Sequence, residues 1–234
     1  MAATGLLLVG FLATHLAGNF LLFASPKASN DYAHALTSKG PLIWAAELGL
    51  LGLFVIHIVC AIRTKAISAA ARPQAYAMRQ THGESTLQSR TMVHTGGVIL
   101  VFLIIHLITF KFGEEYVTIA DADNAAIRDL YLTVVECFAS KAYSALYIAC
   151  MVLLGFHLKH GFQSAFQTLG LNHPRYFPMI KKASLGLAIL FAGGYAIFPI
   201  VFGFANPVDI AKYKADNQIS PATQTIEQPA TGEQ

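Results

Sequence analysis

The sequence predicts an all-α integral membrane protein with five transmembrane helices, and two observations predict this fold class. Hydrophobic residues make up 55% of the 234 residues and charged residues only 12%, and the mean hydropathy is +0.52, far from the values of soluble domains. Apolar runs of the length that crosses a bilayer, roughly 17 to 25 residues, occur five times. They cover residues 3–24, 42–62, 93–112, 142–158 and 183–204.

The first and fifth runs, and the segment before the fourth, have features that refine this interpretation. We interpret the first as a retained helix, because neither a basic leader nor a cleavage site with a soluble domain behind it marks a signal peptide. The sequence AAIRDLYLTVVECF, residues 125–138, predicts an interfacial helix before the fourth run, and Pro199 is expected to kink the fifth. Residues 1–205 then form one transmembrane domain, and 206–234 a polar, partly disordered tail. We find no internal repeat.

The distribution of charge predicts the topology. Five basic residues and one acid, Glu84, lie between the second and third runs, and four basic residues without an acid lie between the fourth and fifth. An odd number of spans places both segments on one side, which the positive-inside rule assigns to the cytoplasm. The N-terminus is then cytoplasmic and the C-terminus outside. These nine of the 16 Lys and Arg residues are Arg63, Lys65, Arg72, Arg79, Arg90, Lys159, Arg175, Lys181 and Lys182.

Four of the five runs contain histidine, which is costly in a membrane and therefore usually functional. With alternating directions, His15 and His106 share a level toward the outside, and His57 and His157 share a level toward the inside. The two levels differ by roughly 10 to 15 Å at 1.5 Å per residue. Two imidazoles at each level, on four helices, are what two bis-histidine haems in a four-helix bundle require, with the fifth helix closing the bundle.

Other histidines and small residues leave this assignment partly open. His94 and His160 are substitutes for His106 and His157, although both lie near the inner surface. Gly18, Gly96 and Gly155 suit either a planar group between helices or plain helix packing. The three cysteines form no CxxC or CxxCH motif, so a thiolate metal site or covalently attached haem is not indicated.

The pieces THLAGNFLLF, FVIHIVCAIR, SRTMVHTGG with LIIHLITF, and LLGFHLKHGFQSAF occur in this order. In these motifs the chain resembles the five-helix, di-haem cytochrome b558 membrane anchors of succinate dehydrogenases and fumarate reductases. The resemblance covers all five runs, residues 1 to about 205. It implies two b haems, the distal one held by His15 and His106 and the proximal one by His57 and His157.

The resemblance also implies the partners and the location. The expected complex contains a flavoprotein subunit and an iron–sulfur subunit on the cytoplasmic face, and it lies in the bacterial inner membrane, as a monomer or dimer of complexes. This chain would bind lipid and a quinone, menaquinone by preference, and no nucleic acid. It would pass electrons between the iron–sulfur subunit and the quinone, without being a catalyst alone.

Two departures from the family pattern weaken parts of this expectation. Relatives often begin with a basic, serine-containing leader before an ALTGL-like start, whereas this chain opens with MAATGL. Some relatives carry an intramembrane acid shortly before the fourth ligand, but here residues 153–156 are LLGF. Polar groups for the proximal propionates and for proton transfer would have to come from elsewhere.

Candidate residues around the haems follow from charge and position. Arg90, then Lys159 and His94, could bind the propionates of the inner haem, or they could be ordinary flanking charges. Glu47, His34, Lys39 and Trp44 lie around the start of the second run and predict an outer quinone site. Glu47 could instead be an acid favoured by a helix N-terminus, and an inner site near Arg90 and His94 competes.

Two rival functions remain open on the sequence. A di-haem anchor of a formate dehydrogenase or a hydrogenase would have the same paired histidines with a different partner enzyme. A haem-free, proton-coupled transporter would use the four histidines as a proton relay. The absence of intramembrane Asp or Glu partners beside those histidines disfavours the transporter.

Overall fold

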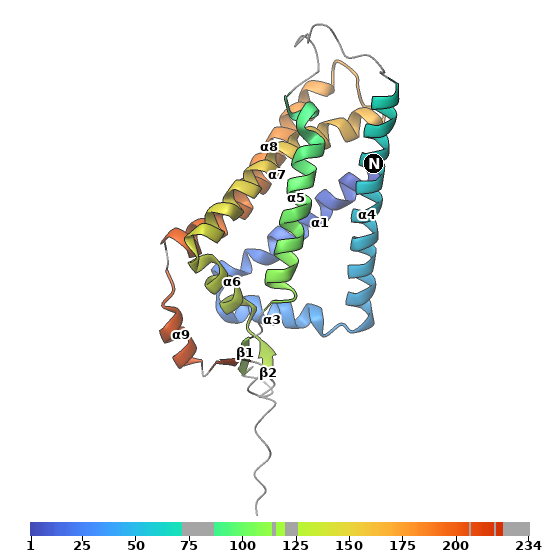
Figure 1. Cartoon of the computed structure of the whole chain (residues 1–234). Helices are drawn as coiled ribbons and strands as arrows, with labels where there is room; N and C mark the ends of the chain where they lie inside the picture. Colours follow the sequence, from blue (N-terminus) through green and yellow to red (C-terminus); the bar gives the residue numbers. More distant parts are fainter. Residues whose placement is uncertain (72–86, 114–115, 120–125, 206, 218, 222–234) are drawn as a thin grey trace, which may run out of the picture. The chain divides into compact units, whose positions relative to one another are not determined.

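The computed structural model describes residues 1–71, 87–113, 116–119, 126–205, 207–217 and 219–221. Arg72, Arg79, the side chain of Arg90 and the tail from residue 222 lie outside what it describes. Five helices in the described ranges are long and apolar enough to cross a membrane (Figure 1). The predicted all-α, multi-pass membrane fold is therefore confirmed. The spans are Ala2–Phe23, Pro41–Ala70, Thr91–Phe110, Lys141–Thr168 and Phe177–Ala205.

The long helices are α1 (Ala2–Asn19), α4 (Pro41–Ala70), α5 (Leu87–Phe110), α7 (Lys141–Thr168) and α8 (Phe177–Phe198). The short helix α2 (Leu21–Ala24) follows α1. From Pro199 the chain continues with π-helical turns, η1 (Pro199–Ala205). A proline has no N–H to donate to the preceding turn. The interruption expected at Pro199 therefore takes the form of π-helical turns.

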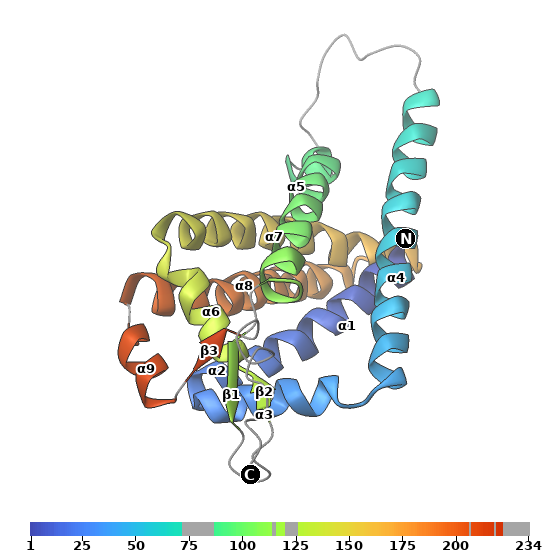
Figure 2. The same ribbon diagram turned by 60° about the horizontal axis from the view of Figure 1, so that its bottom comes forward.

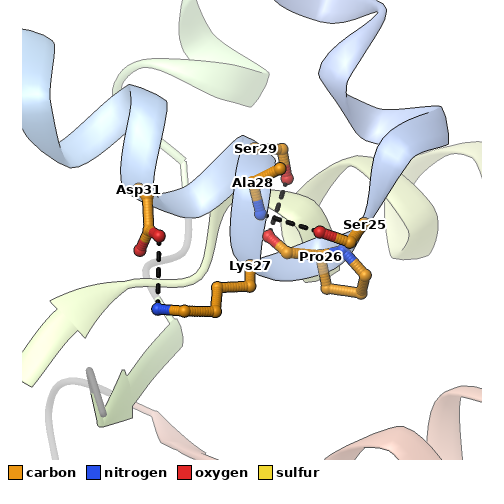
Figure 3. A network of polar contacts seen from close by, with 6 residues as sticks. All are labelled: Ser25, Pro26, Lys27, Ala28, Ser29 and Asp31. Carbon is orange, nitrogen blue, oxygen red and sulfur yellow. Dashed lines mark hydrogen bonds and ion pairs between the residues drawn. The ribbon is translucent and has the colours of Figure 1, made fainter. Parts of the chain in front are cut away.

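The connection between the first two spans contains the helix α3 (Pro26–Thr37), whose start is fixed by its own sequence. The Ser25 hydroxyl accepts a hydrogen bond from the Ala28 N–H at 3.0 Å, and Pro26 occupies the first turn, where no N–H is needed (Figure 3). Lys27 and Asp31 form an exposed i,i+4 ion pair at 3.2 Å. The sequence Ser25–Pro26 is thus typical of a helix N-terminus.

The chain divides into two compact units. The first unit comprises residues 1–15, 41–101 and 150–194. In it, an added Cβ on Gly155 of α7 would lie 3.0 Å from the Ala192 Cβ of α8, so these two helices pack through small residues. By contrast, α4 has no residue that the protein itself buries. Its faces are open to lipid and to any group seated between helices.

The second unit comprises residues 16–40, 102–149 and 195–234. Its short elements are the helices α6 (Leu130–Ala139) and α9 (Ile210–Asp216) and the strands β1 (Tyr116–Ile119), β2 (Ala126–Arg128) and β3 (Ser220–Pro221), which form an antiparallel sheet in the order β2-β1-β3 (Figure 2). The helix expected over residues 125–138 starts at Leu130, because β2 takes the residues before it. Most of α6 is buried.

A buried polar network holds the second unit together. Asp129, with 0% exposure, accepts hydrogen bonds from the Asn30 side chain and the Leu132 N–H, both at 2.9 Å, and from the Tyr213 hydroxyl at 3.1 Å. The side-chain Oδ1 atom of Asn30 accepts a hydrogen bond from the Tyr131 N–H at 2.9 Å. This network joins α3, α6 and α9. Residues 210–216 of the polar C-terminal segment thus form a helix that binds α6.

Candidate functional site: two imidazoles held by threonines

His57 of α4 is held by the start of α1. The Thr4 Oγ1 atom lies 3.1 Å from His57 Nδ1, and the same hydroxyl donates a hydrogen bond to the Met1 carbonyl at 2.8 Å. The neighbouring Gly5 faces the same ring, because an added Cβ there would lie 3.4 Å from His57 Cε1. A hydroxyl and a bare backbone therefore line the edge of this imidazole.

His157 of α7 is held in the same way by α5. The Thr95 Oγ1 atom lies 3.2 Å from His157 Nδ1 and also donates to the carbonyls of Thr91, at 3.2 Å, and Met92, at 3.1 Å. An added Cβ on Gly96 would lie 3.4 Å from His157 Cε1. The distances repeat those around His57 almost without change.

These contacts favour one tautomer of both rings. A threonine hydroxyl carries one proton, and in each case a backbone carbonyl lies within its reach. With that proton on the carbonyl, the proton between hydroxyl and ring comes from Nδ1, and Nε2 keeps its lone pair for another partner. In this tautomer the first unit presents two imidazoles with the same nitrogen available as a ligand.

His106 belongs to the second unit and has a different partner. The Tyr147 hydroxyl of α7 lies 3.2 Å from His106 Nδ1. The rings of Phe102 and Phe110 lie one turn before and after His106, with centroids 5.9 and 5.1 Å from the imidazole. His106 is thus contacted by a tyrosine hydroxyl and two phenylalanine rings, whereas His57 and His157 of the first unit are each contacted by a threonine and a glycine.

The remaining predicted ligands have less specific surroundings. His15 is half-buried in the first unit and stacks on Phe11 at 5.4 Å. His94 is exposed on α5, and His160 is half-buried on α7, eight residues before that helix ends at Thr168. Among the described side chains, His57 and His157 are the histidines that the structure holds alike.

The other predicted site residues are mostly at the surface. Lys159 is half-buried in α7, and the side chain of Arg90 lies outside the described residues. Trp44 and Glu47 are exposed in the first turns of α4, with Trp44 at 69%. His34 and Lys39 are exposed in the second unit.

The small residues near the histidines separate into two roles that the sequence alone left open. Gly96 contacts the His157 ring, whereas Gly155 packs on α8. An added Cβ on Gly18 would come within 2.7 Å of the Tyr32 ring of α3. Gly18 and Gly155 therefore serve helix packing, and Gly96 serves the imidazole.

Sequence reasoning named Gly96 but missed Thr4, Gly5, Thr95 and Tyr147, although a signal for the first three was present. The segments TGLLLVGFLATH, residues 4–15, and TGGVILVFLIIH, residues 95–106, share Thr, Gly, Phe and His at the same spacing. In addition, α4 begins 16 residues before His57, and α7 begins 16 residues before His157. The two helix pairs therefore share a short pattern, where no internal repeat was expected.

Comparison of the chain with protein-family models, with curated proteins and with solved structures gives no match. Across the described residues, no group of three or more His, Cys, Asp or Glu side chains is placed to hold a metal ion. Arguments about function therefore rest on the motifs of the sequence and on the geometry of the paired imidazoles.

Proposed function

We propose that the chain is the di-haem cytochrome b membrane anchor of a succinate:quinone oxidoreductase. The observation that carries this proposal is the matched pair of threonine–imidazole contacts, Thr4 with His57 and Thr95 with His157. Both contacts leave Nε2 as the free ligand atom, which is the tautomer that axial ligation of a haem iron through Nε2 requires. The matched contacts come from two pairs of membrane-spanning helices, as the proposed bundle demands.

The residues around this pair fit a haem. His57 and His157 would be its axial ligands, and Gly5 and Gly96 leave space beside the ring edge that leads to Nε2. Helix α4, without a buried residue of its own, has apolar surface for a macrocycle to cover. When bound, haem supplies one-electron redox chemistry whose potential depends on axial ligands, hydrogen bonds and burial. Lys159, His94 and Arg90 are the candidate partners for its propionates.

The second pair in the proposal is His15 with His106, which the order and depth of the motifs predict. On the His106 side, the Tyr147 hydroxyl lies at Nδ1, so Nε2 would be directed to the iron if the phenol accepts the proton. Phe11 and Phe102 each stand four residues before a predicted ligand, and both rings lie against that imidazole. Each of the two imidazoles thus has an aromatic neighbour on its own helix, and their pairing at one haem rests on the motifs.

In the proposed reaction, electrons pass between the cytoplasmic ends of the spans and their outer ends. The basic segments would face the iron–sulfur subunit on the cytoplasmic side, with the flavoprotein subunit beyond it. The quinone would be bound near the other end, where the exposed Glu47 and Trp44 begin α4 and a carboxylate can exchange a proton with a quinone oxygen. The alternative quinone site near Arg90 and His94 predicts that Glu47 variants retain quinone reduction.

The test is a pyridine haemochrome assay on the purified membrane complex, with a reduced-minus-oxidised spectrum taken after succinate is added. We expect two b haems per chain, reduction by succinate, and a flavoprotein and an iron–sulfur protein in the preparation. His94→Ala is the matched control, because His94 is an exposed histidine of the same helix α5 that carries His106. It should keep both haems, whereas His106→Ala should lose one.

The rival functions give different results in the same assay. A colourless purified protein would overturn the haem proposal and leave the proton-coupled transporter. Two haems that succinate does not reduce, together with formate or hydrogen oxidation by the copurifying subunits, would identify the anchor of another respiratory complex. Loss of haem in His94→Ala but not in His106→Ala would overturn the assignment of the ligands.

A further inference from the structure

The repeated Thr–Gly pair has the same position in both helix pairs. Thr4 precedes His15 by 11 residues, and Thr95 precedes His106 by 11 residues. Yet each threonine binds a histidine of the following span rather than the one on its own helix. The repeat therefore places one hydroxyl on each of two imidazoles, His57 and His157, in the same compact unit.

We propose that Thr4 and Thr95 are paired positioning residues that fix the tautomer of His57 and His157 and lower the midpoint potential of the haem that these histidines bind. This inference rests on the proposed function. Neither threonine would touch the haem. Each would act through the histidine ring that its hydroxyl contacts.

The direction of these hydrogen bonds decides whether the potential of the haem is lowered or raised. Each hydroxyl reaches a backbone carbonyl to which it can donate its proton, and its oxygen then accepts from Nδ1–H. An acceptor at Nδ1 makes an imidazole more basic and a stronger electron donor through Nε2. A stronger donor stabilises ferric more than ferrous iron. Removing either acceptor should therefore raise the midpoint potential of this haem.

The same geometry fixes the orientation of the rings. The hydroxyl holds one edge of each imidazole at 3.1 to 3.2 Å, and the adjacent glycine leaves the Cε1 edge with only backbone beside it. Because the two arrangements are alike, each ring has one polar anchor on one side. Loss of an anchor should allow that ring to rotate about its Cβ–Cγ bond.

The experiment uses the purified complex with Thr4→Val, Thr95→Val and the double variant, studied by potentiometric titration and by low-temperature EPR. Valine keeps the shape of threonine without the acceptor. At a fixed ambient potential we expect each single substitution to lower the ratio of oxidised to reduced haem by about fivefold, the effect of one ordinary hydrogen bond. The double variant should lower the ratio further than either single variant, because both contacts act on the same haem.

Both substitutions should affect the same haem and leave the other unchanged. The low-spin ferric EPR signal of that haem, which reports the angle between the two ring planes, should shift in the same variants. Thr4→Ser and Thr95→Ser, which keep the hydroxyl, should restore the potential and the signal. A merely structural role in helix packing would change thermal stability without a haem-specific shift.

Thr14→Val is the matched control. Thr14 lies on α1 next to His15, and its hydroxyl donates to the Phe11 carbonyl at 3.0 Å. It should leave both potentials unchanged. Two haems with unaltered potentials and EPR signals in all three valine variants would overturn this inference and leave the proposed function intact. Absence of haem from the unmutated complex would overturn the proposed function itself.

Discussion

The two compact units hold their buried polar groups in opposite ways. In the second unit, Asp129 receives three hydrogen bonds from three parts of the chain and is fully buried. In the first unit, His57 and His157 are half-buried, and each is held at one nitrogen by a single threonine. The carboxylate of Asp129 thus finds its partners within the second unit, whereas the two imidazoles of the first unit keep one ring nitrogen for another partner.

This difference separates a polar network that serves stability from two imidazoles that can serve binding. A closed network with every partner supplied by the protein is costly to break and specifies one structure. An imidazole anchored at Nδ1 alone is oriented but still able to accept a ligand at Nε2. The contrast can be tested by disturbing each unit separately, and four substitutions are expected to do so with decreasing effect.

The largest effect is expected from Gly96→Leu in the first unit. A leucine side chain there would displace the His157 imidazole, because the first added carbon already lies 3.4 Å from Cε1. We expect loss of one of the two haems in a pyridine haemochrome assay. Gly97→Leu, at the adjacent glycine with nothing within 4 Å of an added Cβ, should keep both. Equal loss in both variants would show that Gly96 has no special role.

The next effect is expected from Asp129→Ala in the second unit. Removing the carboxylate would leave the buried donors of Asn30, Leu132 and Tyr213 without their acceptor, at a cost of about 3 to 5 kcal/mol. Thermal denaturation and hydrogen exchange should report the loss in α3, α6 and α9. Asp31→Ala, which removes an exposed i,i+4 ion pair, should cost less than about 0.5 kcal/mol. A similar melting temperature for both variants would contradict this account.

A smaller change is expected from Tyr147→Phe. The substitution removes the hydroxyl 3.2 Å from His106 Nδ1 and keeps the ring that packs against Phe102 and Phe138. It should shift the potential of the haem that the Thr4 and Thr95 variants leave unchanged. Tyr143→Phe, one turn earlier on α7, is the control. If the Tyr147 and Thr95 variants shift the midpoint potential of the same haem, the proposal of two separate haem sites is contradicted.

The smallest effect is expected from raising the pH. Burial, followed by the negative charge of Asp129 and the hydrogen bond to it, raises the pKa of the Tyr213 hydroxyl above its usual 10. The folded state therefore keeps this proton when the unfolded state loses it, so stability is fully present below pH 10 and falls above it. Tyr213→Phe should cost about 1 kcal/mol at pH 8 and remove part of the alkaline decline. An unchanged decline in melting temperature would exclude Tyr213 as its cause.

The sequence predicts the spans well because hydrocarbon thickness sets their length and composition. It does not predict that α7 continues to Thr168, since polar residues such as Lys159 and Gln163 extend beyond the apolar run. Strand β2 and helix α9 depend on pairing and on Asp129, which are contacts between distant segments. Histidines were noticed because they are rare in membranes. Their threonine partners were not, because a hydroxyl in an apolar helix commonly bonds to its own backbone.

The most direct test of the central claim, that His57 and His157 serve one site, is a haem count in His57→Ala, His157→Ala and the double variant of the purified complex. If both imidazoles ligate the same haem, each single variant and the double variant should contain one haem per chain. The retained haem, with its unaltered spectrum, reports that the protein is folded. Loss of both haems only in the double variant would place the two histidines in different sites and contradict the account.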